Sequence, residues 1–311
     1  MSTKTIRVEI VTPVHNRRDI TLLCLRSLSR IETAGLAVHV IVVDDGSTDG
    51  TSDAIRAELP DVEVIAGDGN LWFTEGTNVG VRAALARKPD YVLMINDDQV
   101  FDSVFLRAMV ETAEKHPRSV VGPLLLLWDT PHVLFQTSLV WDTWGGGWRP
   151  WYSQTVWTVP EKPWKVGLIV GNCVLVPAAA FSECGLMDSK RYPNFGDAEF
   201  TPRLRKAGWQ LLIDPRSRVF CMPNTIAPPL RGQGLKKMFS ALFIDLGNGH
   251  NLRRRFYAYM DSSPTRLQGA VAFFVFLGRS ALGNSYDRQE FGKYKFERPL
   301  KETFASDVVD D

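Results

Sequence analysis

The chain of 311 residues lacks several features that would assign it quickly to a protein class. It has no apolar run of the about 20 residues that a membrane span needs, and its first residues lack the apolar core of a signal peptide. Its four cysteines form no CxxC pair, which favours a reducing compartment and buried, unreactive thiols. The formal net charge of +1 provides no field for nucleic acid. We therefore expect a cytoplasmic protein with no nucleic-acid partner.

Apolar runs alternate with segments of helical spacing through the amino-terminal half. Strands are predicted at 8–12, 38–43, 62–65, 91–95 and 120–122, and helices at about 20–31, 52–58, 74–87 and 103–115. Thr74 is expected to cap the third of these helices. Strands that alternate with helices of this length predict an α/β fold with a doubly wound, mostly parallel sheet.

The two glycine-loop motifs that bind nucleotides in many such sheets are missing. Gly67-Asp-Gly69 supplies the first half of GxGxxG, but the third glycine is absent, and no GxxxxGK[ST] loop occurs. A nicotinamide dehydrogenase is therefore disfavoured. Phosphate would have to be bound by another device, such as a divalent metal on a carboxylate.

Pairs of carboxylates follow two of the predicted strands. Asp44 and Asp45 end the second strand, and Asp97 and Asp98 follow the strand at 91–95. Open α/β sheets bind ligands beyond the carboxyl ends of their strands. Adjacent carboxylates repel each other unless solvent, a cation or hydrogen-bond donors neutralise them. Solvated loop corners would explain an isolated pair, but two pairs predict one cleft with a metal and a phosphate-bearing ligand.

Four motifs in order resemble those of the family 2 glycosyltransferases of GT-A fold. They are Thr12-Pro-Val-His15-Asn-Arg17, the Asp44–Thr51 run DDGSTDGT, Gly76-Thr-Asn78-Val-Gly80, and Asn96-Asp97-Asp98. The resemblance continues through the strand Val170–Val176, which contains Gly171 and Asn172, and through Asp197, Glu199 and Arg203. It covers roughly residues 6–220.

The resemblance implies a role for each matching residue. Pro13 and His15 would lie against the nucleobase, Asp45 would hydrogen-bond it, and Asn78 would sit near the base or ribose. Asp97 would touch the ribose, and Asp98 would hold Mg²⁺ or Mn²⁺ on the diphosphate. Asp197 would be the general base that deprotonates an acceptor hydroxyl. Supporting and acceptor-side roles fall to four residues: Glu199, Arg203, Gly171 and Asn172.

Three positions depart from the family pattern. Asn96 replaces the first acid of a DxD motif, and Gly196 replaces the acid expected before Asp197. The segment 219–224 lacks a histidine that many family members use as a further metal ligand, and Cys221 is a poor ligand for a hard cation. The number of metal ligands therefore stays open.

The carboxyl-terminal part of the chain carries less specific signals. Seven of the nine tryptophans fall within residues 128–164, where aromatic faces could pack on acceptor sugars or simply cover an irregular insertion. Residues 231–300 hold twelve Lys and Arg against five Asp and Glu, beside the apolar run 269–278. This pattern suits peripheral contact with an anionic membrane, self-association or ordinary core packing.

Together these features predict a GT-A glycosyltransferase domain over 1–230, followed by a helical, basic extension over 231–311. The domain would have a nucleotide-sugar half at 1–125 and an acceptor half at 126–230. The expected partners are a nucleoside diphosphate-sugar, with dTDP- or UDP-sugars favoured, and a glycan or lipid-linked glycan of a bacterial surface polysaccharide. A sugar-1-phosphate nucleotidyltransferase is disfavoured, because its glycine-rich basic loop is missing after the first strand. A catalytically silent nucleotide- or glycan-binding scaffold of the same fold remains the alternative.

Overall fold

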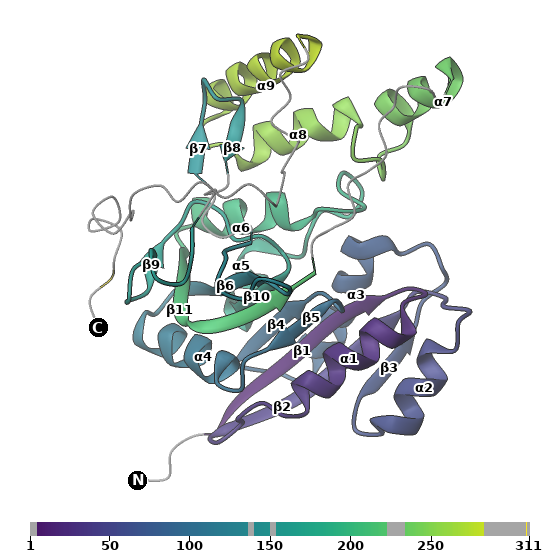
Figure 1. Cartoon of the computed structure of the whole chain (residues 1–311), viewed down its shortest axis with the longest axis vertical. Helices are drawn as coiled ribbons and strands as arrows, with labels where there is room; N and C mark the ends of the chain where they lie inside the picture. Colours follow the sequence, from purple (N-terminus) through teal and green to yellow (C-terminus); the bar gives the residue numbers. More distant parts are fainter. Residues whose placement is uncertain (1–4, 136–139, 150–153, 223–233, 283–308, 310–311) are drawn as a thin grey trace.

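A computed structural model describes residues 5–135, 140–149, 154–222, 234–282 and 309. A mixed, mostly parallel sheet of nine strands forms its centre, in the order β3-β2-β1-β4-β10-β6-β11-β5, with β9 paired to β11 (Figure 1). The strands are β1 (Ile6–Val14), β2 (Leu36–Asp44), β3 (Glu63–Ala66), β4 (Tyr91–Ile95), β5 (Gln99–Phe101), β6 (Ser119–Leu127), β9 (Trp164–Lys165), β10 (Cys173–Pro177) and β11 (Gln210–Cys221). A separate hairpin joins β7 (Val140–Asp142) and β8 (Gly147–Arg149). The predicted α/β class is confirmed.

Helices cover both faces of the sheet and continue beyond it at the carboxyl-terminal end (Figure 1). They are α1 (Arg18–Leu28), α2 (Thr51–Glu58), α3 (Trp72–Ala86), α4 (Phe105–Lys115), α5 (Ala178–Cys184), α6 (Asp197–Lys206), α7 (Leu235–Phe239), the π-helix η1 (Ser240–Ile244), α8 (Leu252–Ser262) and α9 (Arg266–Ala281). The helices α1 and α4 share one hydrophobic core with the sheet, and α3, α5 and α6 share the core on its other face. The last three α-helices follow the sheet; α8 packs on α6, α9 packs on α8, and α7 continues into η1.

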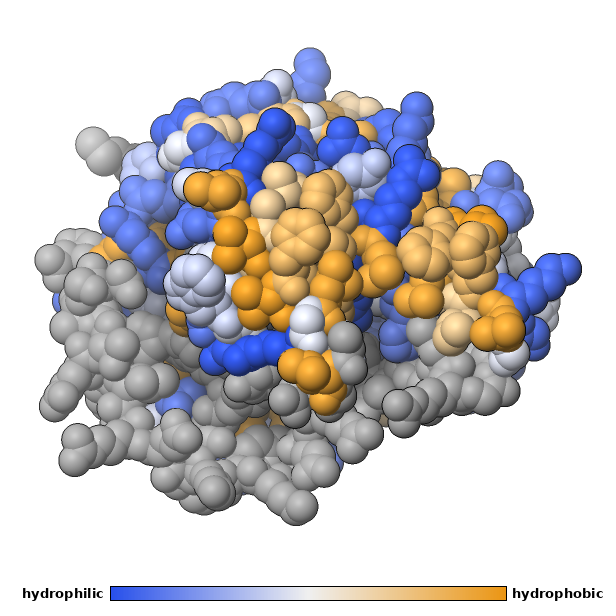
Figure 2. All heavy atoms as spheres, turned by 90° about the horizontal axis from the view of Figure 1, so that it is seen from above, coloured by the Kyte–Doolittle hydropathy of each residue, from blue (hydrophilic) through white to orange (hydrophobic). Residues whose placement is uncertain are grey.

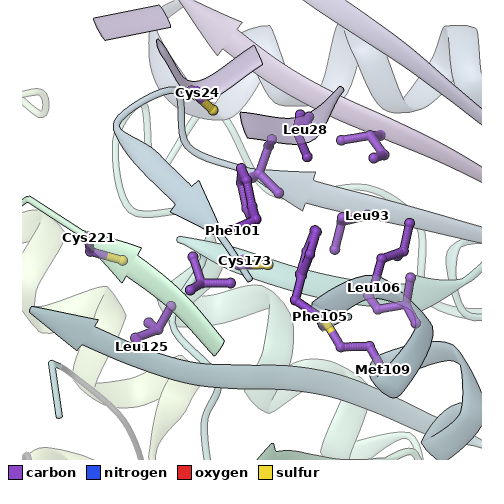
Figure 3. Packing of buried hydrophobic residues seen from close by; sticks show 14 of the residues in the cluster. Cys24, Leu28, Leu93, Phe101, Phe105, Leu106, Met109, Leu125, Cys173 and Cys221 are labelled. Atoms are coloured by element: carbon purple, nitrogen blue, oxygen red, sulfur yellow. The ribbon is translucent and has the colours of Figure 1, made fainter. Parts of the chain in front are cut away.

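The first core buries the apolar stripes of α1 and α4. Leu28 and Phe105 approach the sheet residue Leu93 from these helices, and Phe101 packs on Phe105 with ring centroids 4.5 Å apart (Figure 3). Every residue of β4 is buried, as its unbroken apolar sequence predicts. Cys24, Cys173 and Cys221 lie in the same core as free thiols, in agreement with the inert role expected for them.

One strand reverses the direction of the sheet where its two halves meet. The chain runs parallel through β3, β2, β1 and β4, but β10 is antiparallel to both β4 and β6. Because of this reversal, the start of β10 lies beside the end of β4, and the backbone N–H of Asn96 donates to the carbonyl of Asn172 at 2.9 Å. The donor-side and acceptor-side segments therefore reach the same edge of the sheet.

The glycines of the Gly76-Thr-Asn78-Val-Gly80 motif allow α3 to lie directly on β1. A Cβ on Gly80 would be 2.3 Å from Val11 Cγ1, and one on Gly76 would be 2.9 Å from Pro13 Cβ. Real Cβ atoms do not approach so closely, so a larger residue at either position would push the helix away from the strand. The motif thus sets the position of the amino end of α3 above the sheet.

Gly80→Ala is expected to destabilise the protein by about 1–3 kcal/mol, because the added methyl group overpacks the α3–β1 contact. Denaturant unfolding of the two proteins measures the difference. Gly278→Ala is the matched control, since a Cβ at this α9 position meets nothing within 4 Å. The control should be neutral or slightly stabilising. Equal stability of Gly80→Ala and the natural protein would contradict the close-packing explanation.

Candidate active site

The carboxyl ends of β1, β2 and β4 carry the predicted donor-side residues to one edge of the sheet. Val14 at the end of β1 pairs with Asp44 at the end of β2, and β4 runs alongside β1 in the same direction. His15 and Arg17 follow β1, Asp45 follows β2, and the Asn96–Asp98 segment follows β4. Four predicted site residues, His15, Asp45, Asp97 and Asp98, are therefore brought to the same edge of the sheet.

Arg17 bridges the two acids that follow β4. Its guanidinium donates to Asp97 Oδ1 at 2.9 Å and to Asp98 Oδ2 at 3.0 Å, and Thr21 Oγ1 donates to Asp97 Oδ2 at 2.8 Å. The two acids are 4% and 8% exposed. Burial raises the pKa of Asp97 to about 6, against the lowering effects of Arg17 and Thr21. Arg17 belongs to a quoted motif, but its role as the counter-ion of both carboxylates was not predicted.

The residues near Asp98 fit a metal ion that takes several of its ligands from the substrate. Asn96 Oδ1 is buried without a hydrogen-bond partner, and the Asp98 carboxylate lies two residues further along. Mg²⁺ is commonly bound by one or two protein oxygens together with substrate phosphates. Within the described ranges, no group of three or more His, Cys, Asp or Glu side chains can hold a metal ion. Cys221 is fully buried and accepts from Gln99 Nε2, so it offers no replacement for the missing histidine.

Asp45 organises the loop that leads into α3. Its carboxylate accepts from the backbone N–H groups of Gly69, Leu71 and Trp72 at 2.8–3.0 Å. These bonds satisfy amides at the start of the helix, which begins at Trp72 and has no side-chain cap. The prediction that Thr74 caps the helix is wrong, because Thr74 Oγ1 instead accepts from the backbone N–H of Gly196. The predicted contact between Asp45 and a nucleobase stays a prediction.

The remaining donor-side residues lie on both sides of this loop. His15 Nδ1 is 2.6 Å from the carbonyl oxygen of Asp45, and Pro13 touches α3 at Gly76. Asn78 is buried and bonds both backbone groups of Met187, with its Oδ1 accepting at 3.2 Å and its Nδ2 donating at 2.9 Å. It therefore ties α3 to the acceptor half, and its predicted place near the base or ribose stays a prediction.

Asp197 begins α6 and faces the start of β10. Its Oδ2 accepts from the backbone N–H of Gly171 at 2.8 Å, and a Cβ on Gly171 would be 2.4 Å from Asp197 Cβ. Only glycine at 171 therefore lets the carboxylate approach this amide. Burial raises the pKa of Asp197, and the Gly171 hydrogen bond opposes the shift. Once deprotonated, such a carboxylate is a stronger base than an ordinary aspartate.

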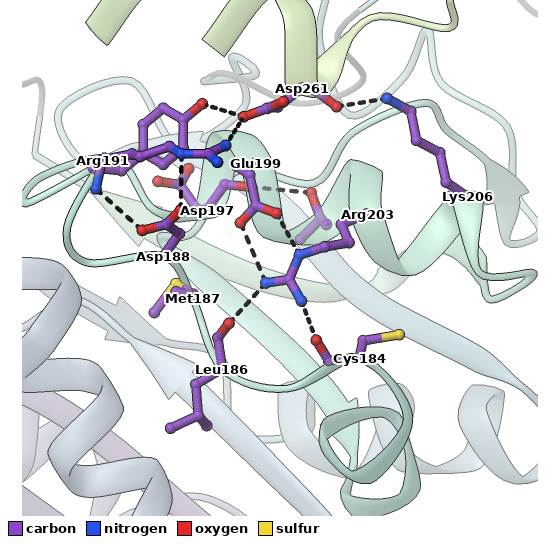
Figure 4. A network of polar contacts seen from close by, with 12 residues as sticks. Cys184, Leu186, Met187, Asp188, Arg191, Asp197, Glu199, Arg203, Lys206 and Asp261 are labelled. Atoms are coloured by element: carbon purple, nitrogen blue, oxygen red, sulfur yellow. Dashed lines mark hydrogen bonds and ion pairs between the residues drawn. The ribbon is translucent and has the colours of Figure 1, made fainter. Parts of the chain in front are cut away.

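Glu199 and Arg203 support the same segment from within α6. Arg203 pairs with Glu199 one turn away and donates to the backbone carbonyls of Cys184 and Leu186 (Figure 4). These contacts fix the loop between α5 and α6, which contains Asp188 and leads to Asp197. The supporting and acceptor-side roles predicted for Glu199 and Arg203 stay predictions.

The carboxyl-terminal helices are joined to the segment before Asp197 through one acid. Asp261 of α8 accepts from the Tyr192 hydroxyl at 2.8 Å and pairs with Arg191 at 3.2 Å, while its carbonyl accepts from Lys206 at 2.6 Å (Figure 4). The sequence carried no signal for this contact, because Asp261 belongs to no motif and its partners lie far away along the chain.

The Trp-rich segment contains both packed and exposed side chains. Trp164 is fully buried, and Trp141 packs edge-to-face on Trp148, whose indole N–H donates to Ser262 of α8 at 2.9 Å. Trp144 and Trp157 are exposed, and Trp151 lies outside the described residues. Much of the segment therefore covers the join with α8 and α9, while its predicted contact with an acceptor stays a prediction.

The fold and the site define an α/β protein whose carboxylates lie at one edge of a mostly parallel sheet, where such folds bind their ligands. Residues 9–152 match the family model described as glycosyl transferase family 2. The chain is also 29% identical over 203 residues to the N-acetylglucosaminyl-diphospho-decaprenol L-rhamnosyltransferase of Mycobacterium tuberculosis, from both strain CDC 1551 and strain H37Rv. That alignment covers 58% of this chain and 66% of the relative, just under two thirds of its length.

Solved structures support the same assignment at the level of the fold. GalNAc-T7, crystallised with UDP, GalNAc and Mn²⁺, superposes with a TM-score of 0.58 at 14% identity, over 92% of this chain and 56% of that one. Residues 1–349 of TarS from S. aureus superpose with a TM-score of 0.55 at 12% identity, over 93% of this chain and 76% of TarS. The sequence matches confirm the predicted resemblance to the family 2 glycosyltransferases, and the superpositions confirm the GT-A fold.

Proposed function

We propose that the protein transfers one sugar from a nucleoside diphosphate-sugar to a hydroxyl of a growing surface glycan, with inversion at the anomeric carbon. The observation that carries this proposal is the backbone hydrogen bond between Asn96 and Asn172. It joins the segment of Asp98, at the expected diphosphate position, to the segment of Gly171, which holds Asp197. A leaving-group site and a base on the two sides of one cleft are sufficient for a direct displacement.

Each residue of the site has a defined task in this proposal. Asp98 and the free amide oxygen of Asn96 would hold Mg²⁺ or Mn²⁺, while Arg17 keeps the neighbouring carboxylates paired. The bound ion supplies neutralisation of the charge that grows on the diphosphate as the glycosidic bond breaks. Asp197 takes the proton of the acceptor hydroxyl while its Oδ2 keeps the Gly171 hydrogen bond. No covalent sugar–enzyme intermediate is required.

The known relatives narrow the class of donor and acceptor. The M. tuberculosis relative is named as a rhamnosyltransferase that acts on a sugar linked through a diphosphate to decaprenol, and GalNAc-T7 was crystallised with UDP and Mn²⁺. We propose a dTDP- or UDP-activated hexose or deoxyhexose as donor, and a lipid-linked glycan as acceptor. The acceptor would be reached from the cytoplasmic side.

Calorimetric titration with UDP, dTDP, GDP and CMP, each with and without Mn²⁺, tests the donor site directly. Binding of one nucleotide that strengthens with Mn²⁺ supports the proposal and reduces the number of candidate sugars. A donor identified in this way can then be offered with a lipid-linked N-acetylglucosamine acceptor, and transfer is read as the released nucleoside diphosphate. No binding by any of the four would favour the catalytically silent scaffold.

The scaffold alternative has one observation in its favour. Arg17 already donates to both Asp97 and Asp98, so one positive charge faces the two carboxylates without a metal ion. A scaffold would bind a nucleotide or glycan equally well with and without Mn²⁺, and neither the natural protein nor a variant at Asp197 would transfer sugar. The hydrogen bond from Gly171 to Asp197 favours the enzyme, since it holds a carboxylate of raised pKa at the start of α6, where a base is expected.

The carboxyl-terminal helices present an apolar and basic surface suited to the membrane that holds such an acceptor. Figure 2 shows apolar side chains gathered on the face above the sheet, where these helices lie in Figure 1. The exposed members are Leu235, Phe239, Phe243, Ile244, Leu267, Phe274 and Leu282. Residues 234–282 contain seven Lys and Arg but only two Asp and no Glu. None of the described helices is long and apolar enough to cross a bilayer, so we propose peripheral contact with anionic lipid.

Replacement of Leu267 and Phe274 by Glu is expected to weaken binding to anionic vesicles at least tenfold, because it places two charges in the apolar stripe of α9. Co-sedimentation with phosphatidylglycerol-containing vesicles measures the effect, and phosphatidylcholine vesicles give the neutral baseline. Leu23→Glu, an exposed position on α1, is the control. Equal binding of the double variant and the natural protein would rule out this surface as the docking site.

A further inference from the structure

A cavity beside the proposed active site has one exposed tryptophan in its wall. The cavity has a volume of about 500 Å³ and lies between the start of α3, the segment before α6 and the loop after η1. Trp72 is 53% exposed there, although tryptophan is among the residues that folding normally covers. The cavity and its tryptophan lie outside the Trp-rich segment and take no part in the donor, metal or base roles described above.

The conformation of Trp72 shows that the fold places this side chain at a cost. Its φ is +58°, in the left-handed region that bulky residues rarely adopt, and glycine is the residue that adopts it freely. The backbone is retained there by the bond from Trp72 N–H to Asp45 Oδ2, at 3.0 Å. One side of the indole is backed by Gly247, where an added Cβ would be 3.0 Å from the ring. The indole therefore rests against Gly247 on one side and is open to solvent on the other.

The walls of this cavity are bonded to both sides of the proposed reaction centre. Trp72 is tied to Asp45, and Thr74 N–H donates to the carbonyl of Pro193 in the opposite wall at 2.9 Å. Thr74 Oγ1 also accepts from the N–H of Gly196, the residue immediately before Asp197. A ligand lying on Trp72 would therefore lie next to Thr74, which bonds Pro193 and Gly196 in the segment leading to Asp197.

The lining has the chemistry of a carbohydrate site. Leu71, Pro193 and Leu246 extend the apolar surface around Trp72, and five polar side chains border it: Asn70, Glu75, Ser189, Lys190 and Asp245. Glu75 is paired with Arg82. The opposite charges of Lys190 and Asp245 suit neutral hydroxyl groups, which both donate and accept hydrogen bonds. Flat aromatic surfaces pack on the apolar faces of sugar rings, and the volume lies within the usual range of ligand sites.

We infer that Trp72 is the platform of a saccharide-binding subsite, which takes a sugar ring of the acceptor glycan or of the donor. The inference rests on the proposed function and adds to it the residue that orients one of the reacting sugars. The cavity is open to solvent, so a sugar ring can reach Trp72 from outside. A ring held there would lie beside the start of α3, where Thr74 bonds the residue before Asp197.

The test uses Trp72→Gly in the full-length protein, because glycine accepts the positive φ and keeps the backbone N–H for Asp45. Trp72→Phe retains an aromatic platform, and Trp144→Ala removes another exposed indole, on the connection between β7 and β8. Thermal unfolding verifies that each variant folds. Ligand-observed NMR with the methyl glycosides of N-acetylglucosamine and rhamnose then reports sugar binding without any need for turnover.

The inference expects Trp72→Gly to lose the saturation-transfer signal of at least one glycoside, while Trp72→Phe and Trp144→Ala keep it. With active enzyme, a tenfold or greater rise in acceptor KM at unchanged nucleotide affinity assigns the ring to the acceptor. The natural protein should bind the nucleotide sugar and the nucleoside diphosphate with different affinities. If Trp72→Gly binds both equally, the ring on Trp72 is the sugar of the donor. Natural sugar binding by Trp72→Gly would overturn the inference. The NMR measurement reports sugar binding and does not depend on transfer. Absence of turnover in the natural protein would therefore refute the proposed function, while the saccharide subsite could still be tested.

Discussion

Asp197→Asn is expected to lower the rate of sugar transfer by about 10²–10⁴-fold while donor affinity stays within a factor of two of the natural value. The amide oxygen of asparagine can still accept from Gly171 N–H, so the start of α6 keeps its geometry. What is lost is the ability to take a proton from the acceptor hydroxyl. Steady-state rates measured as released nucleoside diphosphate, together with calorimetry of donor binding, separate these two effects.

The pH dependence of the natural enzyme gives an independent check of this role. A general base works only when deprotonated, so kcat/KM must rise as pH rises through the pKa of Asp197. Because burial raises that pKa, the acid limb should lie above the pH at which an ordinary aspartate titrates, about 3.9. Asp53→Asn, which replaces an exposed acid of α2, should leave rate and profile unchanged. Natural turnover by Asp197→Asn would remove Asp197 as the base.

Asp98→Ala is expected to abolish the dependence of nucleotide affinity on Mn²⁺. Without this carboxylate, the ion loses its charged protein ligand, and any remaining affinity should come from contacts with the base and ribose. Calorimetric titrations of the identified nucleotide with Mn²⁺ and with a chelator give the comparison. If Mn²⁺ raises the nucleotide affinity of Asp98→Ala as much as it raises that of the natural protein, Asp98 is not a ligand of the metal ion.

Asp98→Ala also breaks the ion pair between Arg17 and Asp98, and a second variant, at Arg17, separates this effect from the loss of the metal ligand. Asp98 Oδ2 accepts from Arg17, so Asp98→Ala frees half of the guanidinium fork as well as removing the ligand. Arg17→Met removes the fork and leaves the Asp98 carboxylate in place. The dependence on Mn²⁺ should persist in Arg17→Met and vanish in Asp98→Ala. Loss in both variants would assign the effect to the ion pair, with no role for metal binding at Asp98.

The sequence was sufficient to predict the parts of the structure that depend on local patterns. The fully buried run Tyr91–Ile95 forms a central strand, and the acids after it lie at the predicted edge. The spacing of Gly76 and Gly80 marks a close helix–strand contact, for which the structure supplies the neighbouring atoms. Both features can be predicted because each depends on a few neighbouring residues: an unbroken apolar run is typical of a buried strand, and glycines four residues apart allow close helix packing.

Features created by long-range contacts could not be predicted in the same way. The Arg17 fork joins residues on separate strand ends, and Asp261 meets Tyr192 only after α8 has folded back over α6. The sequence predicts that α3 begins at Thr74, whereas the helix begins at Trp72. Asp45, which follows β2, accepts from the amides at this end, so the local cap expected at Thr74 is not needed. Trp72 was overlooked for a similar reason, since its exposure and positive φ become visible only in three dimensions.

The reversed strand β10 has a mechanical consequence for the way this molecule can work. Its ladders to β4 and β6 join the two halves of the protein within one continuous sheet. A hinge between the halves would have to break these backbone hydrogen bonds, so separating the halves as rigid bodies costs more than moving a surface loop. The strand pairing thereby ties the Asp98 segment to the Gly171 segment that bonds Asp197.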